Sequence, residues 1–273
     1  MEKKLINSIS QLAIDAGQEI LSVYKSSDLE IQTKGDGSLV TEADHAAHRT
    51  ILKGLLKLDG NLPVLSEESA PSNIEERASW GRYWLVDPLD GTAEFVAGNG
   101  EFTVNIALIE NHCPRLGVVH APVQGLTYMG AKGLGALVRD CHGERVIKTR
   151  TVDSVIARKD SIVIMRSRRH AEGGVNPLLK NISNKIGPLK AKKMGSSLKI
   201  CFIAEGKADL YPRLGPTSEW DTAAAHAILE AAGGTVIDPD FKKLSYNSKA
   251  DLLNPFFFAI GDPNYDWPSL IKD

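Results

Sequence analysis

Hydrophobic positions recur with a helical period in two segments of the first sixty residues. In residues 5–24, apolar side chains such as Ile9, Leu12, Ala16 and Ile20 lie three or four positions apart, which predicts an amphipathic helix. The same spacing over residues 43–58 predicts a second helix. Residues 34–41 (KGDGSLVT) contain two glycines and predict a loop between these helices.

Short apolar runs then predict strands. A strand over residues 63–65 and a second over residues 82–86 each end in acidic residues. Three further strands, expected to be antiparallel, follow at residues 102–109, 115–121 and 126–131, with a turn at residues 111–114 between the first two. One more strand is expected at residues 161–165.

The remaining chain predicts helices and loops. Residues 168–195 have weak periodicity and many lysines, which indicates loops and one helix. Residues 197–205 predict a helix that opens at Gly195-Ser196-Ser197, and the alanine-rich residues 222–232 predict a helix ended by two glycines. The pattern alone thus predicts a mixed α/β protein with antiparallel strands. No linker-like segment separates its halves.

Composition restricts the class of protein. The chain has 273 residues, of which 42% are hydrophobic and 24% are charged, as in ordinary globular proteins. No apolar run approaches the roughly 18 residues that span a bilayer, so no integral membrane segment is expected. Three cysteines lie far apart with no C-x-x-C pair, so a zinc site is not expected. This use of cysteine is typical of proteins in the reducing cytoplasm. Peripheral attachment to the inner face of the membrane and the oligomeric state stay open.

Charge is distributed unevenly along the chain. Residues 139–213 contain 17 Lys and Arg residues against 7 Asp and Glu residues, although the whole chain has a net charge of −2. One interpretation is a cation site in the acidic part and an anionic ligand held by the basic part. The alternative is a set of solvated surfaces. Nucleic-acid binding is not expected, because the chain is not basic overall and lacks interleaved aromatic and basic residues.

Carboxylates follow two consecutive predicted strands. Glu67 and Glu68 end the first, and Asp87 and Asp90 end the second within the sequence D-P-L-D-G-T. Carboxylates forced together repel and raise one another's pKa, and a hard divalent cation such as Mg²⁺ removes that cost. A turn or a solvated edge could explain either element alone. Both together, followed by a glycine and a threonine, favour a metal site.

Asp221 precedes the alanine-rich helix and has two possible roles. As an N-cap it would accept a backbone N–H bond, which is a common role for aspartate. It could also face a metal and an anion at the helix N-terminus. Asp36, in the glycine-rich loop, could close over such a site or serve only in a turn.

These elements resemble the signature of the inositol monophosphatase superfamily, a group of lithium-sensitive, Mg²⁺-dependent phosphomonoesterases. The match combines V-T-E-A-D at residues 40–44, the glutamate pair, the D-P-L-D-G-T element and Trp220-Asp221, in order, over roughly residues 5 to 260. The segments L-S-E-E (65–68), G-E-F-T-V-N-I-A-L-I (100–109), G-S-S-L-K (195–199) and Y-P-R-L-G-P-T (211–217) are most similar to the bacterial 3′(2′),5′-bisphosphate nucleotidases of the CysQ type.

The resemblance implies a fold and a set of site residues. The fold would be a layered αβαβα sandwich of the α+β kind, with a metal-binding half at residues 1–140 and a substrate-binding half at residues 141–273. Two or three Mg²⁺ ions would be held by Glu67, Asp87, the carbonyl of Leu89, Asp90 and Asp221. The catalytic pair Asp44 and Thr92 would orient and deprotonate the attacking water. Substrate contacts are expected from Glu67, Leu89, Asp90, Gly91, Thr92, Ser196, Ser197, Arg213 and Asp221.

The implied activity is removal of the 3′-phosphate from adenosine 3′,5′-bisphosphate, a by-product of sulfate activation. An inositol or sugar monophosphatase is the alternative enzyme. A non-catalytic nucleotide- or RNA-binding protein is less favoured, because the acidic set is complete. Ser196 and Ser197 could bind phosphate or merely cap a helix. Ala93 departs from the lysine usual after D-G-T, which leaves the metal ligands intact but bears on substrate preference.

Overall fold

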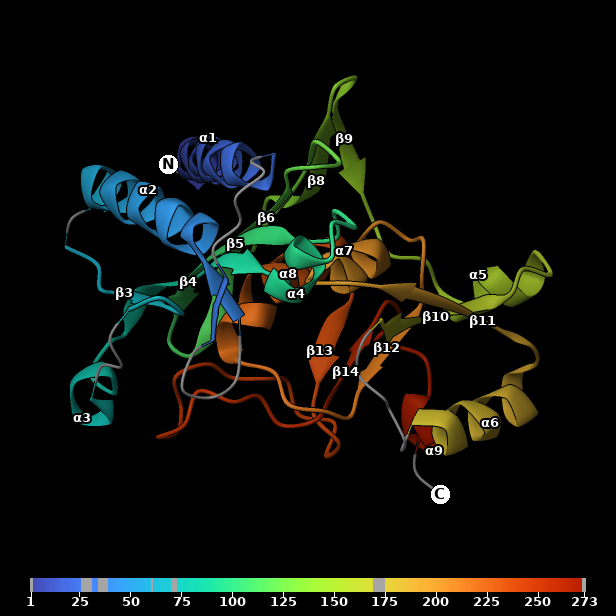
Figure 1. Ribbon diagram of the computed structural model, residues 1–273. Coiled ribbons are helices and arrows are strands. Elements are labelled where there is room, and N and C mark those ends of the chain that lie inside the picture. The colour runs from blue at the N-terminus through green and yellow to red at the C-terminus, as the bar shows by residue number, and fades with distance from the viewer. Residues whose placement is uncertain are drawn as a thin grey trace.

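The computed structural model describes residues 2–25, 31–33, 39–59, 61–69, 73–168 and 175–271 (Figure 1). Its helices are α1 (Glu2–Tyr24), α2 (Glu42–Asp59), α3 (Ile74–Arg77), α4 (Thr92–Val96), α5 (Val152–Ala157), α6 (Val175–Ile186), α7 (Leu198–Ala204), α8 (Glu219–Ala232) and α9 (Trp267–Ile271). Its strands are β1 (Ile31–Thr33), β2 (Leu39–Thr41), β3 (Val64–Ser66), β4 (Arg82–Asp90), β5 (Thr103–Glu110), β6 (Cys113–Ala121), β7 (Leu126–Ala131), β8 (Gly135–Asp140), β9 (Gly143–Ile147), β10 (Ile162–Ser167), β11 (Leu189–Met194), β12 (Leu210–Arg213), β13 (Thr235–Ile237) and β14 (Phe257–Ile260).

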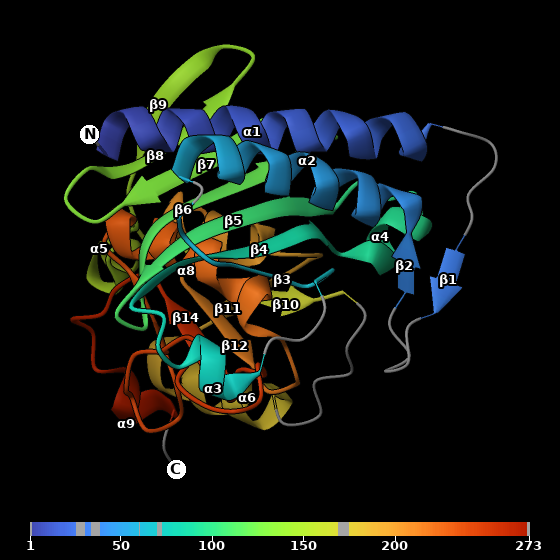
Figure 2. The same ribbon diagram turned by 90° about the vertical axis from the view of Figure 1, so that its left-hand side faces the viewer.

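The two larger of the three sheets in the described residues alternate with three helical layers (Figure 2). The larger sheet has the strand order β3-β4-β5-β6-β7-β8-β9, and the smaller sheet has the order β11-β10-β12-β14-β13. Helices α1 and α2 pack on the outer face of the larger sheet, α7 and α8 lie between the sheets, and α6 and α9 cover the smaller sheet. The layered α+β sandwich expected from the resemblance is therefore confirmed.

Helix α8 lies at the centre of the molecule because its small residues allow close packing. Ala223, Ala224 and Ala225 are buried, and the strands facing them carry glycines. A Cβ atom at Gly117 in β6 would lie 2.0 Å from the carbonyl oxygen of Ala224. Any side chain at that position would push the helix away from the larger sheet, so the glycine fixes the depth at which α8 sits.

The parallel pairing of β3 and β4 brings their acidic ends together. Val64 pairs with Trp84 and Ser66 with Val86, so Glu67 and Asp87 follow at the same edge of the sheet. Beyond this point the pairing of β4 with β5 is interrupted by a bulge between Asp87 and Asp90. Bulges change the direction of side chains next to functional sites. Because of this bulge, the side chains of Asp87 and Asp90 do not follow the regular alternation between the two faces of the sheet.

Several expected elements differ from the structure. Residues 39–41, expected in a loop, form β2 and pair with β1, while residues 34–38, including Asp36, lie outside the described residues. The expected turn at residues 111–114 is shorter, because β6 already begins at Cys113. Residues 189–194, expected as helix or loop, form β11, whose central residues are exposed at the edge of the smaller sheet. Lysines are common on exposed edge strands, where they prevent pairing with other chains. Because they interrupt the apolar pattern, the sequence does not identify this strand.

The larger sheet is built from residues 64–147 and the smaller from residues 162–260. The boundary expected near residue 140 lies in the turn between β8 and β9. The division into a metal-binding and a substrate-binding half stays a prediction. No helix among the described residues is both long and apolar enough to cross a membrane.

His120 in β6 generates a prediction about acid stability. Its Nδ1 lies 2.9 Å from the Thr127 hydroxyl, and its ring packs against Gly17 of α1. Burial lowers the pKa of His120 to about 4 from 6.5. Between these pH values the unfolded chain binds a proton that the folded chain refuses, so the free energy of unfolding falls as pH falls, by about 3 kcal/mol over the whole interval.

Chemical denaturation between pH 7 and pH 4 measures this effect. The variant His120→Gln keeps a hydrogen-bonding side chain but cannot titrate, so its free energy of unfolding should fall less than that of the wild type over the same interval. Parallel pH profiles of the two proteins would contradict the assignment.

Candidate active site

A cavity of about 420 Å³ opens where β4, α4, α7, β12 and α8 meet. Its volume is typical of sites that hold a small molecule. Its lining includes the carboxylates of Asp87, Asp90 and Asp221, which we call the acidic wall, and the cationic side chains of Lys199 and Arg213, which we call the cationic wall. Negative and positive walls in one cavity suit a metal ion together with an anionic ligand.

Three aspartates form the acidic wall. Each of Asp87, Asp90 and Asp221 offers one oxygen atom, and these atoms lie within 4.8 Å of one another. Burial raises the pKa of Asp87 well above its usual value, and the charge of Glu67 adds to the rise. Burial likewise raises the pKa of Asp221, with a further contribution from the charge of Asp90. The cluster therefore concentrates negative charge that a bound cation would offset.

Glu67 lies on the cavity wall directly after β3. It is outside the group of oxygens within 4.8 Å of one another among the described residues, although its charge acts on both Asp87 and Asp221. Leu89, the other expected ligand, also lines the cavity, and its carbonyl accepts a hydrogen bond from the Thr92 hydroxyl at 3.4 Å. The structure thus places all five expected metal ligands on one cavity.

Asp90 is held by residues from two distant parts of the chain. Its Oδ2 accepts the backbone N–H of Ser197 at 2.6 Å and the side-chain amide of Asn105 at 3.3 Å. The Asn105 amide also donates to the Ser197 hydroxyl at 2.9 Å. Ser197, expected to contact substrate, therefore directs both its backbone N–H and its side chain toward the acidic wall. Sequence analysis cited Asn105 only within the segment at residues 100–109 and did not identify it as a site residue, because a mid-strand asparagine has no local signal of its role.

Asp221 occupies the third position of α8 rather than its N-cap. The helix begins at Glu219, three residues earlier than expected, with Ser218 as its N-cap. Asp221 Oδ2 accepts the backbone N–H of Ser218 at 2.9 Å, which completes a capping box. The same side chain supplies an oxygen to the acidic cluster. The two roles weighed for Asp221 are compatible, because one carboxylate has two oxygens.

Asp44 and Thr92 lie together behind the acidic wall. Asp44 lies in the first turn of α2. Its Oδ2 accepts hydrogen bonds from the backbone N–H and from the hydroxyl of Thr41, both at 2.7 Å. Its Oδ1 accepts the hydroxyl of Thr92 at 3.3 Å. Burial raises the pKa of Asp44. Thr92 lines the cavity, so a proton can pass from the cavity to a buried carboxylate through one hydroxyl.

Gly91 sets the direction of the chain between Asp90 and Thr92. Its φ of 94° lies in the left-handed region, and a Cβ atom there would lie 3.2 Å from the Glu101 carbonyl oxygen. Glycine adopts this backbone conformation without strain. The sharp change at Gly91 starts α4, so the backbone of residues 91–93 turns along the cavity wall.

The cationic wall consists of Lys199 and Arg213, both of which are buried. The Lys199 ammonium donates to the Ser196 carbonyl at 2.5 Å and lies 5.3 Å from the centre of the Tyr211 ring. Burial lowers the pKa of Lys199, and the charge of Asp90 opposes this shift. Sequence reasoning cited Lys199 only within a motif and missed it as a site residue, because nothing in a helical pattern marks a lysine that turns inward.

Arg213, at the end of β12, donates from Nη2 to the carbonyl of Pro216 at 2.7 Å. Its buried Nε has no hydrogen-bond partner among the described residues. An unpaired buried N–H donor is costly unless a ligand accepts it. Arg213 is therefore suited to an anion in the cavity.

Other candidates lie at the rim. Arg168 forms a two-pronged ion pair with Glu101, at 2.9 and 2.5 Å, and Glu101 also accepts the backbone N–H of Gly195 at 2.8 Å. Ser196 lines the cavity next to Gly195 with a φ of 50°. Glu101, just before β5, thereby connects Arg168, just after β10, with Gly195 in the segment before α7.

The donor set fits Mg²⁺. Every candidate ligand offers an oxygen atom, from Asp or Glu carboxylates or from the Leu89 carbonyl, and hard cations prefer oxygen donors. Among the residues that the structure describes, no histidine or cysteine lines this cavity. The pKa values of Asp87 and Asp221 are raised by burial and by neighbouring negative charges, and a bound cation would reduce this electrostatic repulsion.

Comparison with known proteins agrees with this geometry. The sequence profile of the inositol monophosphatase family matches residues 1–255. The chain is 46% identical over 254 residues to the 3′(2′),5′-bisphosphate nucleotidase CysQ of Shigella flexneri, covering 93% of this chain and 98% of that protein. It is 48% identical over 254 residues to the protein of the same name from Salmonella typhimurium, with the same coverage.

Solved structures share the overall fold. The crystal structure of CysQ from Bacteroides thetaiotaomicron, described as a bacterial member of the inositol monophosphatase family, superposes with a TM-score of 0.78 at 38% identity and covers 93% of this chain and 97% of its own. The inositol monophosphatase TM1415 of Thermotoga maritima superposes with a TM-score of 0.77 at 22% identity, covering 99% of this chain and 96% of its own, and shows the fold. The chain belongs to the inositol monophosphatase family.

Proposed function

We propose that the protein is a 3′(2′),5′-bisphosphate nucleotidase that uses Mg²⁺ to hydrolyse adenosine 3′,5′-bisphosphate to AMP and phosphate. The observation that carries this proposal is the pairing of an acidic wall with a buried cationic wall in one cavity. The names of the relatives from Shigella flexneri and Salmonella typhimurium support it. An inositol or sugar monophosphatase needs one phosphate site, so Lys199 and Arg213 favour a substrate with a second phosphate.

The acidic wall would hold the metal, and Asp44 and Thr92 would handle the proton. When bound, Mg²⁺ would offset the charge of the ester phosphate and activate a water molecule for attack. The Thr92 hydroxyl orients that water and directs its proton toward Asp44 Oδ1, 3.3 Å away. The raised pKa of Asp44 increases its ability to keep the proton.

The cationic wall would hold the second phosphate. The ammonium of Lys199 has three N–H donors, one of which goes to the Ser196 carbonyl. Arg213 adds the unpaired Nε donor. Both groups are already desolvated, so their interactions with a phosphate are strong and cost little reorganisation. We further propose a cytoplasmic enzyme of sulfur metabolism, with which the three free cysteines are consistent.

The substitution Asp90→Asn tests the metal assignment. It removes one negative charge from the cluster while preserving an acceptor for the Ser197 N–H. We expect turnover of adenosine 3′,5′-bisphosphate to fall by about 100-fold or more at saturating Mg²⁺. Phosphate release measures the rate, and thermal denaturation checks that the variant is folded. Turnover like that of the wild type would refute the assignment.

The substitution Arg213→Ala tests the second phosphate site. If the phosphate is bound equally in the ground and transition states, KM for adenosine 3′,5′-bisphosphate should rise by about 10- to 100-fold with little change in kcat. Rates on inositol 1-phosphate, which has no second phosphate, should change little. Parallel assays of adenosine 3′,5′-bisphosphate, AMP, inositol 1-phosphate and fructose 1,6-bisphosphate decide the substrate class. Equal kcat/KM for mono- and bisphosphates in the wild type would argue against a nucleotidase.

Lithium sensitivity is a further expectation. Li⁺ is close to Mg²⁺ in size but has half its charge, so in the site of Asp87, Asp90 and Asp221 it would stabilise a leaving oxygen less well. Li⁺ should inhibit phosphate release at concentrations at which Na⁺ and K⁺ have no effect. Identical titrations with Li⁺ and Na⁺ would contradict the expectation.

A further inference from the structure

A polar loop outside the cavity fixes the position at which α8 begins. In residues 245–254, the Leu252 carbonyl accepts the Glu219 N–H at 2.8 Å. Asn254 donates from its backbone to the Thr217 carbonyl at 2.7 Å and from its side chain to the Ser218 carbonyl, also at 2.7 Å. These contacts hold the segment immediately before Asp221 by its backbone.

Glu219 ties the first turn of α8 to the same loop. It is 1% exposed, and its Oε2 accepts the backbone N–H of Asn247 at 2.6 Å. Its Oε1 has no hydrogen-bond partner among the described residues. A buried carboxylate is costly, and the cost is tolerated where the group secures a particular conformation.

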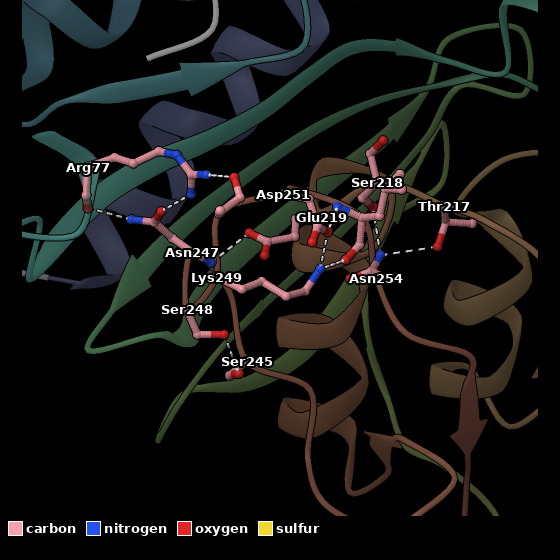
Figure 3. A network of polar contacts seen from close by, with 12 residues as sticks. Arg77, Thr217, Ser218, Glu219, Ser245, Asn247, Ser248, Lys249, Asp251 and Asn254 are labelled. Atoms are coloured by element: carbon pink, nitrogen blue, oxygen red, sulfur yellow. Dashed lines mark hydrogen bonds and ion pairs between the residues drawn. The ribbon is translucent and has the colours of Figure 1, made fainter. Parts of the chain in front are cut away.

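Arg77 connects this loop to the part of the chain that leads into β4, which carries Asp87 and Asp90. It ends α3, in the segment between Glu67 and Asp87, and its side chain points toward the loop that carries Asn247 (Figure 3). The guanidinium of Arg77 donates to Asn247 Oδ1 and to the Ala250 carbonyl. The Asn247 side-chain amide donates back to the Arg77 carbonyl at 2.6 Å. The link is reciprocal and joins residues 170 positions apart.

Asn247 is suited to the centre of this link. It is 1% exposed and has a φ of 54°, a left-handed conformation that asparagine tolerates better than most residues. Its backbone reaches Glu219 while its side chain reaches Arg77. We refer to Arg77, Asn247 and Glu219 as the α8 clamp.

We propose that the α8 clamp is a positioning device for Asp221. The inference rests on the proposed metal-dependent function. Asp87 and Asp90 lie on β4, whereas Asp221 comes from α8, so the charge repulsion within the cluster pushes a helix away from a strand. The clamp links α8 to the segment that leads into β4, and it resists this push.

A carboxylate held in place before the cation arrives binds it more tightly than one that must be drawn back against repulsion. Loss of the clamp would therefore weaken metal binding without disturbing Lys199 or Arg213, which come from α7 and β12. A merely structural role would lower stability and leave metal affinity unchanged.

The experiment measures Mg²⁺ affinity by calorimetric titration of the full chain, with phosphate release as a second measurement. Glu219→Ala removes the contact to Asn247, and Asn247→Gly removes the link to Arg77 while tolerating the left-handed backbone. Both variants should bind Mg²⁺ about tenfold more weakly, since residues that orient metal ligands typically contribute this much. KM for adenosine 3′,5′-bisphosphate at saturating Mg²⁺ should stay within about twofold of the wild type. Glu219→Gln keeps an acceptor for the Asn247 N–H and should restore most of the affinity.

The matched control is Asp209→Asn. Asp209 is also buried and ion-paired, with Arg150 at 2.6 Å, but it supports β10 and β12 rather than α8. This variant should lose stability in thermal denaturation and keep its Mg²⁺ affinity. An equal loss of affinity in the control would show a general effect of destabilisation and overturn the clamp.

The outcomes separate the two proposals. Absence of Mg²⁺ binding by the wild type would overturn the metal site, and the clamp with it. Tight binding by the wild type together with unchanged affinity in Asn247→Gly overturns the clamp alone. Should Glu219→Ala not fold, Asn247→Gly decides the question, because it preserves the backbone contact to Glu219.

Discussion

The repulsion among Asp87, Asp90 and Asp221 is the constraint around which the structure is organised. Oxygens from three carboxylates within 4.8 Å of one another are unfavourable in a buried place, and burial raises the pKa of Asp87 and Asp221 accordingly. Such a cluster persists only if the surrounding fold holds each carboxylate separately. The larger sheet fixes Asp87 and Asp90, and the first turn of α8 fixes Asp221.

The interior contacts show how this is achieved. Ser197 donates its backbone N–H to Asp90, so the segment that opens α7 supports a residue of β4. Asn105, on the strand beside β4, contacts both Asp90 and Ser197. Gly117 allows α8 to approach the larger sheet closely enough for Asp221 to reach the cluster. Packing between the two sheets therefore determines the geometry of the charged site.

The sequence predicted the parts of this arrangement that have strong local signals. Apolar runs marked β4, β5, β6 and β7, and the helical period marked α1 and α2. The D-P-L-D-G-T element predicted metal ligands because turn chemistry does not readily explain it together with the glutamate pair, and the structure brings its two aspartates close to Asp221. Asp221 was identified as a residue with two roles, although its position in the helix was wrong by one turn: the capping box starts at Ser218.

Elements without a local signal could not be predicted. Strand β11 contains Lys190, Lys192 and Lys193 on an exposed edge, so neither apolar alternation nor strand propensity identified it. The loop at residues 245–254 has a polar sequence, and its meaning lies in contacts with residues far away in the chain, such as Arg77. Lys199 was hidden because only the tertiary structure shows that a charged side chain of α7 is buried against Tyr211.

The arrangement of the two walls also bears on which phosphate of a bisphosphate would be hydrolysed. Under the proposed function, a phosphate bound beside Asp87, Asp90 and Asp221 would face Thr92, whose hydroxyl donates to Asp44 and could pass on a proton from water. Under the proposed function, a phosphate bound by Lys199 and Arg213 would be held by cationic groups rather than placed for attack. The excess of basic residues in residues 139–213 can now be related to the structure. Most basic residues of the central stretch lie at the surface or pair with acids, as Arg150 does with Asp209, and two buried ones face the cavity. Selectivity between the two phosphates would then follow from which of these groups each phosphate meets.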